Sequence, residues 1–595
     1  MPRKTLFATI AVWIVATSAL LCGVGLLSTS FLASFEWVKP RVDALALNGS
    51  ANAFTVDQYR DILVRVRAAA VALAFVGGVL FLLRKRLYAG AERACSSLGF
   101  SWRAVAGGVS EAARREEKVH LVGLFALLLA AIILRLAFLF QPIRYDEAYT
   151  YLAYASKPFL VAISRYNAPN NHILNTVLAY ASCALFGNAE WAIRLPAFVA
   201  GVMVVPATYV AARVLYRKHA ALVAAALVAS SSVLIEYSTN GRGYTMVCLF
   251  SLIALALAKR VKDQVDGGGW PLFAIAAAFG FYAVPIMLYP FAVVVVWYGL
   301  SICLDDPGTG RRRAFAHLFS AILLTVALTL MLYSPVLVIS GLSPLVATSD
   351  GQATWGTFIR DTLSAFVATW SQWNRDIPVP LRLLLVLGFA LSLIFHRRVA
   401  EDRMPLLAAV LLGIAPILLA QRVVPFTRVW LFLLPWYFVT AAPGLVFLLR
   451  PLEAKVGAGT TLLFALLSMV LSLWLGVGVV RSQSVVASPE TGTLSDAQEI
   501  VSYLSGTLRP GELVVSDTPS NYPLRYYFVR SGLSASNLVE PSDVPKSAER
   551  IIIVVNGQAH QTLDGIVKAI PSARRAQLKE PVLLRRFSSA SVYGY

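Results

Sequence analysis

Long apolar segments recur along almost the whole chain and limit what it can fold into. The chain has 595 residues, of which 58% are hydrophobic. A transmembrane helix needs about 17–25 mostly apolar residues, and only helices or closed barrels satisfy the backbone inside lipid. The sequence therefore predicts an α-helical polytopic membrane protein with about 13 transmembrane helices. The predicted spans are 5–33, 64–83, 119–140, 194–215, 219–237, 241–258, 270–284, 286–303, 315–340, 380–396, 405–420, 428–449 and 459–480.

The positive charge of the chain follows the pattern of these spans. The net charge of +20 is compatible with nucleic-acid binding, but Lys and Arg gather in short loops between apolar segments. Cytoplasmic loops of membrane proteins carry such an excess, so we expect membrane lipids and no nucleic acid as partners. If the N-terminus is an uncleaved signal anchor that begins inside, every strongly basic loop lies in the cytoplasm; a cleaved signal is the alternative. These loops hold Arg84-Lys85-Arg86, Arg217-Lys218, Lys259-Arg260, Arg311 to Arg313, Arg397-Arg398-Arg403, and Arg450 with Lys455.

This topology divides the chain into three regions. Residues 1–118 are predicted to form a transmembrane pair followed by a basic cytoplasmic loop, and 119–480 the membrane core. In 481–595, strand-like and helical patterns alternate, which predicts a small extracytoplasmic α/β domain. This domain is open to three roles, as a lid, a partner-binding module or a stabilising cap. The predicted location of the whole is the plasma (inner) membrane, which the chain crosses many times.

Two local patterns refine the membrane core. Residues 141–193 are too polar to span the membrane, but 148–162 and 173–186 are amphipathic and suit helices that lie in the interface. Pro285 separates two apolar segments, which predicts either a helical hairpin or one kinked element.

Asp146 and Glu147 stand side by side in this first outer loop. Charges beside a bilayer are costly and often functional, so the pair is a candidate catalytic centre. Helix capping explains the pair equally well, because acidic side chains favour a helix N-terminus. Neighbouring side chains on a helix diverge by roughly 100°, so we expect one carboxylate to act and the other to position.

A second polar cluster follows in the same loop. Asn170, Asn171 and His172 offer donors and acceptors of the kind that sugar hydroxyls require. A lone His beside the membrane is more often a hydrogen-bonding anchor. His172 with a carboxylate leaves a divalent metal ion open as a cofactor, but no HExxH spacing supports a metal site, and none is predicted.

Further polar residues are expected at the same membrane face. Extracytoplasmic arginines oppose the positive-inside bias, which suggests an anionic ligand such as a lipid phosphate, although ordinary headgroup contact is the alternative. We therefore predict substrate-binding roles for Tyr149, Arg194, Glu236, Tyr237, Asn240, Arg242, Tyr244, Arg422 and Arg428, together with Asn170, Asn171 and His172.

The order of these motifs over roughly 119–450 resembles the GT-C glycosyltransferases. It is closest to the branch with protein O-mannosyltransferases and the aminoarabinose transferase of lipid A. The resemblance implies that Asp146, with Glu147 beside it, supplies the catalytic carboxylate as a general base. It also implies a polyprenyl-phosphate sugar donor and a glycan, lipid or protein acceptor. The motifs that carry it are Tyr145-Asp146-Glu147-Ala148-Tyr149, Asn170-Asn171-His172-Ile173-Leu174-Asn175, Phe186-Gly187 through Arg194-Leu195-Pro196, and Tyr237-Ser238 with Arg242-Gly243-Tyr244.

A transporter or flippase of lipid-linked sugars is the main alternative. Such a protein is expected to have repeated halves, broken helices and charges near the membrane midplane. Here the charges lie near helix ends and no repeat is detectable. A membrane anchor that displays the tail is a second alternative, but it would not need a polar cluster spread over four outer loops.

Overall fold

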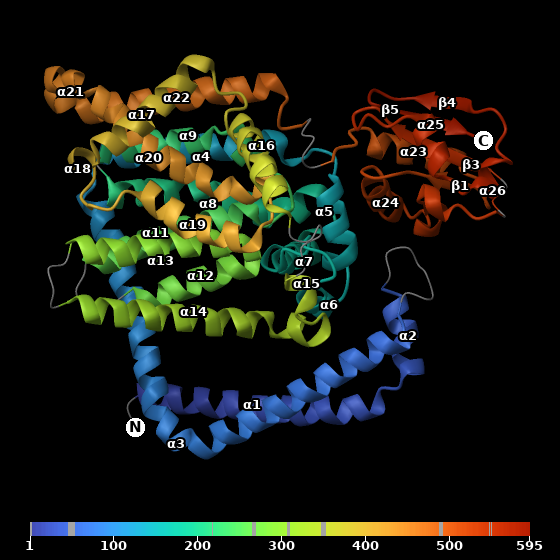
Figure 1. Cartoon of the computed structure of the whole chain (residues 1–595), viewed down its shortest axis with the longest axis horizontal. Helices are drawn as coiled ribbons and strands as arrows, with labels where there is room; N and C mark the ends of the chain where they lie inside the picture. The colour runs from blue at the N-terminus through green and yellow to red at the C-terminus, as the bar shows by residue number, and fades with distance from the viewer. Residues whose placement is uncertain are drawn as a thin grey trace.

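The computed structural model describes all residues except 1–2, 46–53, 217, 264–268, 306–309, 347–352, 487–491, 547 and 549. Arg217 of the predicted basic loops thus lies outside the described residues. A bundle of roughly parallel and antiparallel helices fills one half of the molecule, and a small sheet domain stands at one end (Figure 1). The helical membrane fold with a small C-terminal α/β domain is as predicted.

The number of full-length spans differs from the prediction. Within the described residues, nine helices are long and apolar enough to cross a membrane, or ten if one bent pair counts as a span. The other three predicted spans are shorter helices, so their lengths alone do not qualify them. The nine are α1 (Arg3–Leu32), α3 (Val56–Arg115), α4 (Lys118–Leu139), α8 (Glu190–Leu215), α11 (Tyr244–Asp263), α13 (Leu288–Asp305) with its 3₁₀ turn Pro285–Met287, α14 (Arg311–Ile339), α20 (Leu433–Leu448) with its 3₁₀ turn η3 (Thr427–Phe432), and α22 (Thr460–Ser482). The three shorter ones are α12 (Trp270–Ala283), α17 (Val379–Ile394) and α19 (Leu406–Gln421).

The predicted span 219–237 is broken rather than continuous. It consists of α9 (Lys218–Ala229) and α10 (Ser232–Ser238), which meet at 62°. Arg135 of α4 is fully buried and donates hydrogen bonds to the carbonyl of Ala229 (3.0 Å) and to the hydroxyl of Ser238 (3.1 Å). Where a helix is interrupted inside lipid, its last carbonyls lose their backbone partners and need other hydrogen-bond donors. A cation is favoured there because the C-terminal end of a helix carries partial negative charge. A charge from another helix therefore stabilises this break.

Two further expectations are settled by helix packing. Trp270 of α12 contacts Tyr298 of α13, and Phe281 near the end of α12 contacts Phe291 near the start of α13. The two helices therefore form an antiparallel hairpin around Pro285. The stretch 84–118, predicted as a loop, is helical as far as Arg115 because α3 continues through it.

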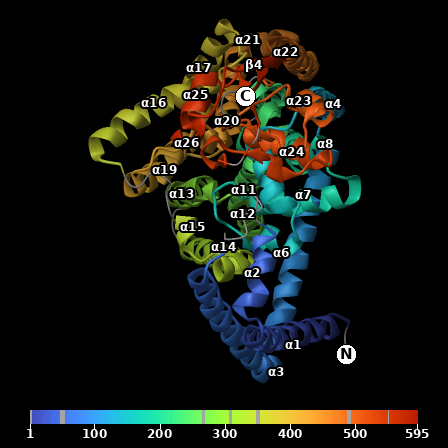
Figure 2. The ribbon, with the colours of Figure 1, turned by 90° about the vertical axis from the view of Figure 1, so that its right-hand side faces the viewer.

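Helices α1 and α3 form an arm beside the bundle (Figure 2). They pack closely through small residues, since a side chain at Gly23 would lie 2.5 Å from the backbone nitrogen of Ala74. Close backbone approach at small residues is a common way for membrane helices to associate.

The first outer loop contains short helices. The predicted stretch 148–162 is divided into α5 (Tyr145–Thr150), a π-helical turn (Tyr151–Ala155) and α6 (Phe159–Ser164), while 173–186 forms α7 (Ile173–Phe186). Helix α16 (Trp355–Trp373) lies beside α19. The short helices α2 (Phe35–Asp43) and α15 (Ser343–Val346) lie at the same end of the molecule as the first outer loop. At the other end lie α18 (His396–Val399) and α21 (Arg450–Val456).

The C-terminal domain is a five-stranded mixed sheet with helices. The strand order is β2-β1-β3-β5-β4, with β1 parallel to β2 and β3, and β5 antiparallel to β3 and β4. All six residues of β3 are buried, as expected for an interior strand covered on both faces. The strands are β1 (Leu513–Val515), β2 (Leu538–Val539), β3 (Ile551–Asn556), β4 (Val582–Arg586) and β5 (Ala590–Gly594), and the helices are α23 (Ala497–Thr507), α24 (Asn521–Arg530), α25 (Leu563–Ala569) and α26 (Ser572–Arg575).

One apolar core joins this domain to the first outer loop. Ile143, Ala148 and Tyr151 of the loop belong to the same buried cluster as Leu524 and Tyr527 of α24. The domain therefore covers the loop that carries Asp146, at the end of the bundle seen at the right of Figure 1.

Candidate active site

Helix α5 begins with the acidic pair, and the two carboxylates face different partners. Glu147 accepts a hydrogen bond from the backbone N–H of Arg144 (2.8 Å), as capping residues do. Its second oxygen accepts the N–H of Gly241 (2.8 Å) and the Nε–H of Arg194 (3.0 Å). Glu147 and Arg194 are both fully buried. Glu147 thus holds α5, α8 and the turn after α10 together.

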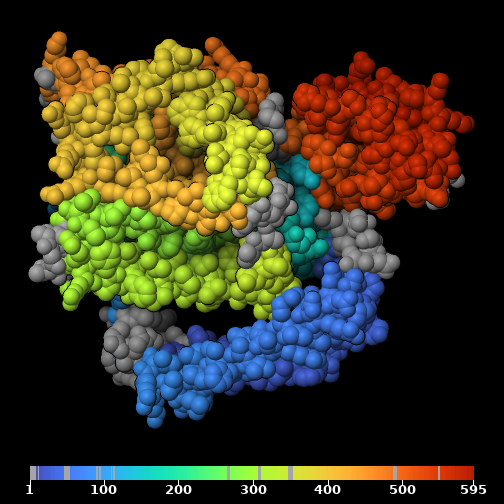
Figure 3. All heavy atoms as spheres, in the orientation of Figure 1, coloured from blue at the N-terminus to red at the C-terminus, as the bar shows by residue number. Residues whose placement is uncertain are grey.

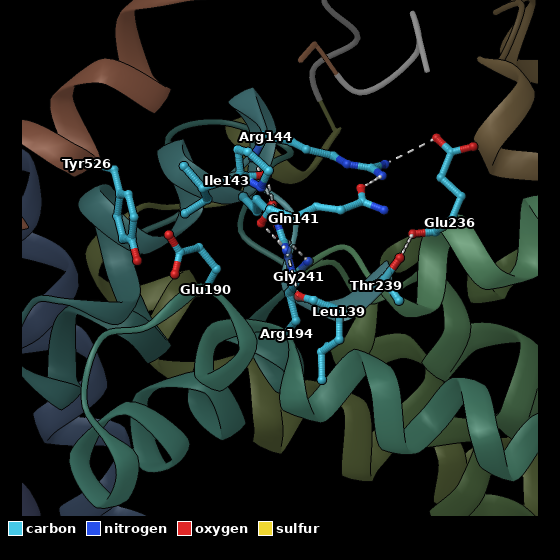
Figure 4. Close-up of polar contacts among 12 residues, drawn as sticks. Leu139, Gln141, Ile143, Arg144, Glu190, Arg194, Glu236, Thr239, Gly241 and Tyr526 are labelled. Carbon is cyan, nitrogen blue, oxygen red and sulfur yellow. Dashed lines mark hydrogen bonds and ion pairs between the residues drawn. The ribbon is translucent and has the colours of Figure 1, made fainter. Parts of the chain in front are cut away.

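A second buried ion pair lies next to the first. The Arg144 guanidinium lies 3.4 Å from Glu236 of α10, which also pairs with Arg375. Arg144 donates a further hydrogen bond to Gln141 (3.0 Å), and burial lowers its pKa. Figure 4 shows Arg144 pointing toward Glu236, with Arg194 and Gly241 beneath. These buried charges are paired and hydrogen-bonded, as burial requires.

Asp146 faces the opposite way and is 13% exposed. One oxygen accepts a hydrogen bond from the amide of Asn170 (3.2 Å). The other lies 3.3 Å from the guanidinium of Arg242 and 3.8 Å from that of Arg428. Three segments far apart in the sequence thus meet at this carboxylate.

His172 and Arg242 form the next layer around Asp146. Nδ1 of His172 accepts the backbone N–H of Gly243 (2.8 Å), and burial, followed by the charges of Arg242 and Arg428, holds the pKa of His172 well below its usual value. The ring is therefore neutral with its proton on Nε2, which lies 3.3 Å from Nη2 of Arg242. The Nε2–H of His172 and the guanidinium of Arg242 are neighbouring donors, which favours an oxygen acceptor beside them. Oδ1 of Asn170 already accepts a hydrogen bond from Arg242 (3.3 Å).

An apolar cavity of about 280 Å³ lies between α16, α19 and η3. Arg428 belongs to η3, between Pro425 and Trp430, which both line the cavity. Figure 3 shows the surface hollowed beside the yellow α16. The lining includes Phe366, Trp370, Trp373, Leu411, Ile414 and Leu418.

The predicted site residues fall into three groups. The first group surrounds the Asp146 carboxylate or flanks it, and it comprises Asp146, Tyr149, Asn170, His172, Arg242, Tyr244 and Arg428. The second group is buried and lies away from the Asp146 carboxylate, and it comprises Glu147, Asn171, Arg194, Glu236, Tyr237 and Asn240. The third is Arg422, whose guanidinium lies over the ring of Trp355 (5.5 Å).

Several residues of the site were not predicted. Arg144 directly precedes the motif that begins at Tyr145, and Arg375 follows α16, but nothing in the sequence pairs either with Glu236. The ring of Tyr522 in α24 meets the ring of Tyr149 edge to face (5.0 Å between centroids) and lies tilted against that of Tyr145 (5.2 Å). No signal in the tail sequence could have placed Tyr522 there, because its partners lie more than 370 positions earlier.

Polar contacts join the C-terminal domain to the loop as well. The Tyr527 hydroxyl accepts the N–H of Ile143 (3.2 Å) and donates to Glu190 (2.8 Å), which also pairs with Arg530 (2.7 Å). The N–H of Tyr145 donates to the carbonyl of Gly492 (2.9 Å). The domain therefore forms part of the surroundings of α5.

Metal ligands do not gather at this site. Among the residues that the structure describes, no group of three or more His, Cys, Asp or Glu side chains could hold a metal ion. The residues beside Asp146 are arginine, asparagine and a neutral histidine. This donor set suits an anion better than a cation.

Comparison with known proteins bears on the region next to Asp146. Residues 175–339 match the family model described as dolichyl-phosphate-mannose-protein mannosyltransferase. The predicted resemblance to the GT-C glycosyltransferases is confirmed. The matched segment runs from α7 to the end of α14, so it includes Arg194, Glu236 and Arg242, whereas Asp146 and Arg428 lie outside it. No curated protein sequence matches the chain.

Three solved structures are similar to the chain over most of its length. ArnT from Cupriavidus metallidurans in the apo state is 12% identical, with 82% of this chain and 98% of that chain covered and a TM-score of 0.49. ArnT from the same organism bound to undecaprenyl phosphate is 14% identical, with 79% and 97% covered and a TM-score of 0.45. The archaeal oligosaccharyltransferase AglB from Archaeoglobus fulgidus, in complex with an inhibitory peptide and a dolichol-phosphate, is 12% identical, with 76% and 71% covered and a TM-score of 0.48. At these identities and scores, the likenesses carry no argument about activity.

Proposed function

We propose that the chain is a membrane glycosyltransferase that moves a sugar from a polyprenyl-phosphate donor to an acceptor hydroxyl at the extracytoplasmic face. The acceptor is a glycan, a lipid or a protein. One juxtaposition supports this proposal above the others. A partly exposed carboxylate, that of Asp146, lies within 3.8 Å of two arginines, and one of them stands beside an apolar cavity.

The reaction needs a base beside the acceptor hydroxyl and an anion-binding group beside the departing phosphate. The acceptor oxygen forms a bond to the anomeric carbon, the bond from that carbon to the phosphate oxygen breaks, and the phosphate leaves with the bonding electrons. Asp146 takes the hydroxyl proton, which contributes about 10²–10⁴ in rate. Phosphate leaves readily as an anion, so the second acid of glycoside hydrolases is not needed.

Arg428, Arg242 and the Nε2–H of His172 are the groups that we assign to the phosphate. Arginine donates in a fork that matches phosphate oxygens, and preorganised donors stabilise the charge that develops on a leaving group. A neutral His172 adds a donor without adding a second full charge beside Arg242. The apolar cavity next to Arg428 suits the first isoprene units of the donor.

Glu147 is assigned a positioning role in this scheme. Its carboxylate is buried and already accepts hydrogen bonds from Arg194, Gly241 and Arg144, so no lone pair is left for a substrate hydroxyl. Tyr149 and Tyr522 are assigned to the acceptor or the sugar, because aromatic faces pack well against apolar sugar faces. This assignment makes the C-terminal domain a part of the site.

Transport of lipid-linked sugars is favoured by one observation, the broken pair α9 and α10 with the buried Arg135 at the break. The two functions differ in whether a covalent bond breaks. Purified protein is incubated with a panel of polyprenyl-phosphate sugars and candidate acceptors, and free polyprenyl phosphate is measured. Glycosyl transfer predicts its release in step with sugar on the acceptor. Movement of the intact lipid-linked sugar across vesicles without release would favour transport.

A further inference from the structure

A second cavity lies at the end of the bundle opposite Asp146. Its volume is about 510 Å³, and it is lined by α8, α9, α18, α20 and α21. Helix α8 begins beside Glu147 and ends at this cavity, so Arg194 and Arg213 are separated by about 28 Å at about 1.5 Å per residue. In Figure 1, α18 and α21 stand at the left end, and α5 with the C-terminal domain at the right. The topology predicted from the basic loops puts the left end in the cytoplasm.

Among the residues that the structure describes, five arginine and lysine side chains and two glutamates line this cavity. Arg213 and Lys218 already pair with carboxylates of the segment before α4, Glu116 and Glu117. Of the two lining glutamates, Glu401 is largely exposed and lies 3.8 Å from Lys259 instead.

The other three lining cations are Arg397, Arg398 and Arg450. Among the described residues, none of the ion pairs involves any of them, and the guanidinium of Arg450 instead lies over the ring of Phe447 (4.5 Å) and donates to the carbonyl of Arg398 (3.2 Å). The cavity is therefore lined by three cations without an ion pair among the described residues, and by one further carboxylate, that of Glu453.

The buried part of the cavity lining is apolar, and a backbone bridge joins two of its segments. Tyr216, at the end of α8, forms an isolated β-bridge with Ala400 after α18. Buried Pro443 and Val446 of α20 complete the wall. A cationic rim over an apolar floor fits a molecule with a phosphate at one end and carbon at the other. Basic pockets between helices at the cytoplasmic face bind such headgroups, and the volume is in the range of ligand pockets, about 300–1,000 Å³.

Topology alone is the simpler explanation of cytoplasmic arginines. Arg312 and Arg313, which are exposed at the start of α14, fit that explanation because they line none of the cavities described. Arg397 and Arg398 are equally exposed, but they border a cavity together with a third arginine from another segment. Arginines of two segments need not border one cavity in order to orient a membrane protein.

We propose that this cavity binds a phosphate-bearing anion at the membrane end opposite the transfer site. An anionic phospholipid headgroup and a soluble phosphate compound share this chemistry. The proposal does not rest on glycosyl transfer, and its test measures binding alone.

The test compares two double variants with matched charge. Arg397→Gln/Arg398→Gln removes two cavity cations, and Arg312→Gln/Arg313→Gln removes two exposed cations at the same membrane end. Full-length protein in phosphatidylcholine nanodiscs is titrated with phosphatidylglycerol, and separately with pyrophosphate at constant ionic strength. Bound ligand is counted by native mass spectrometry, and thermal unfolding is followed in parallel.

We expect the cavity variant to bind at least about tenfold more weakly and the control variant to bind as the parent does. Loss of phosphatidylglycerol binding only would identify a lipid headgroup. Loss of pyrophosphate binding would identify a soluble anion. If neither probe binds, or if both double variants lose affinity equally, the cavity is no anion site and the arginines serve topology.

Discussion

Removal of Arg194 should destabilise the protein more than most single substitutions do. Arg194 donates to Glu147 through Nε (3.0 Å) and to the carbonyls of Leu139 (2.8 Å) and Pro142 (2.9 Å). Arg194→Met leaves the Glu147 charge buried without its cation and those carbonyls without a donor. Removing one partner of a buried pair costs about 3–5 kcal/mol. We expect a loss of unfolding free energy in this range.

A double-mutant cycle separates the ion pair from the rest of the contact. Glu147→Gln keeps the side-chain shape and an oxygen for the N–H of Gly241, and it removes the charge that makes Arg194→Met costly. The double variant should therefore be more stable than the sum of the two single effects predicts, by about 1–3 kcal/mol.

The free energy of unfolding of the parent, the two single variants and the double variant is measured in mixed micelles by tryptophan fluorescence. The release of polyprenyl phosphate per folded molecule is measured in the same samples. If the two single effects add within about 0.5 kcal/mol, the pair does not hold the loops as argued. If Glu147→Gln abolishes release while the fold is intact, Glu147 rather than Asp146 is the base.

Three other predictions use the same preparations. Arg428→Ala should weaken donor binding by about 10-fold or more, whereas Arg422→Ala, which is placed over Trp355, should change it less; equal effects would remove the phosphate role of Arg428. Tyr527→Phe should cost about 1–3 kcal/mol in docking of the C-terminal domain, because it leaves the N–H of Ile143 buried without an acceptor, and faster hydrogen exchange at α5 would report the loss. His172, with its lowered pKa, gains no proton in the folded state, whereas the unfolded chain takes one up below about pH 6.5. Stability should therefore fall below that pH by up to about 1.4 kcal/mol per pH unit, and His172→Gln should flatten this part of the profile; an unchanged slope would mean that His172 titrates normally.

The sequence predicted those parts of the fold that local patterns determine. The bounds of α7 and the alternation of strands with helices in 481–595 follow from apolar periodicity and turn residues. The break between α9 and α10 could not be predicted in this way. Its apolar sequence is that of one span, and the break is stable because Arg135 reaches it from α4.

The same distinction holds within the site. Asp146, Asn170 and Arg242 could be brought together from motifs and topology, since all three belong to loops at one membrane face. The pairing of Glu236 with Arg375 and the edge-to-face contact of Tyr522 with Tyr149 depend on tertiary contacts that join distant segments. No periodicity or spacing in a single sequence reports such pairs.

The account depends most on the carboxylate of Asp146 as the group that takes the acceptor proton. Asp146→Asn keeps the size of the side chain and its contact with the amide of Asn170, but it removes the negative charge. Purified Asp146→Asn should fold with some loss of stability, because the buried Arg242 loses its anion, and it should still bind a polyprenyl-phosphate sugar. Sugar transfer should fall by about 10²–10⁴. Transfer at the parental rate by a folded Asp146→Asn protein would contradict the account.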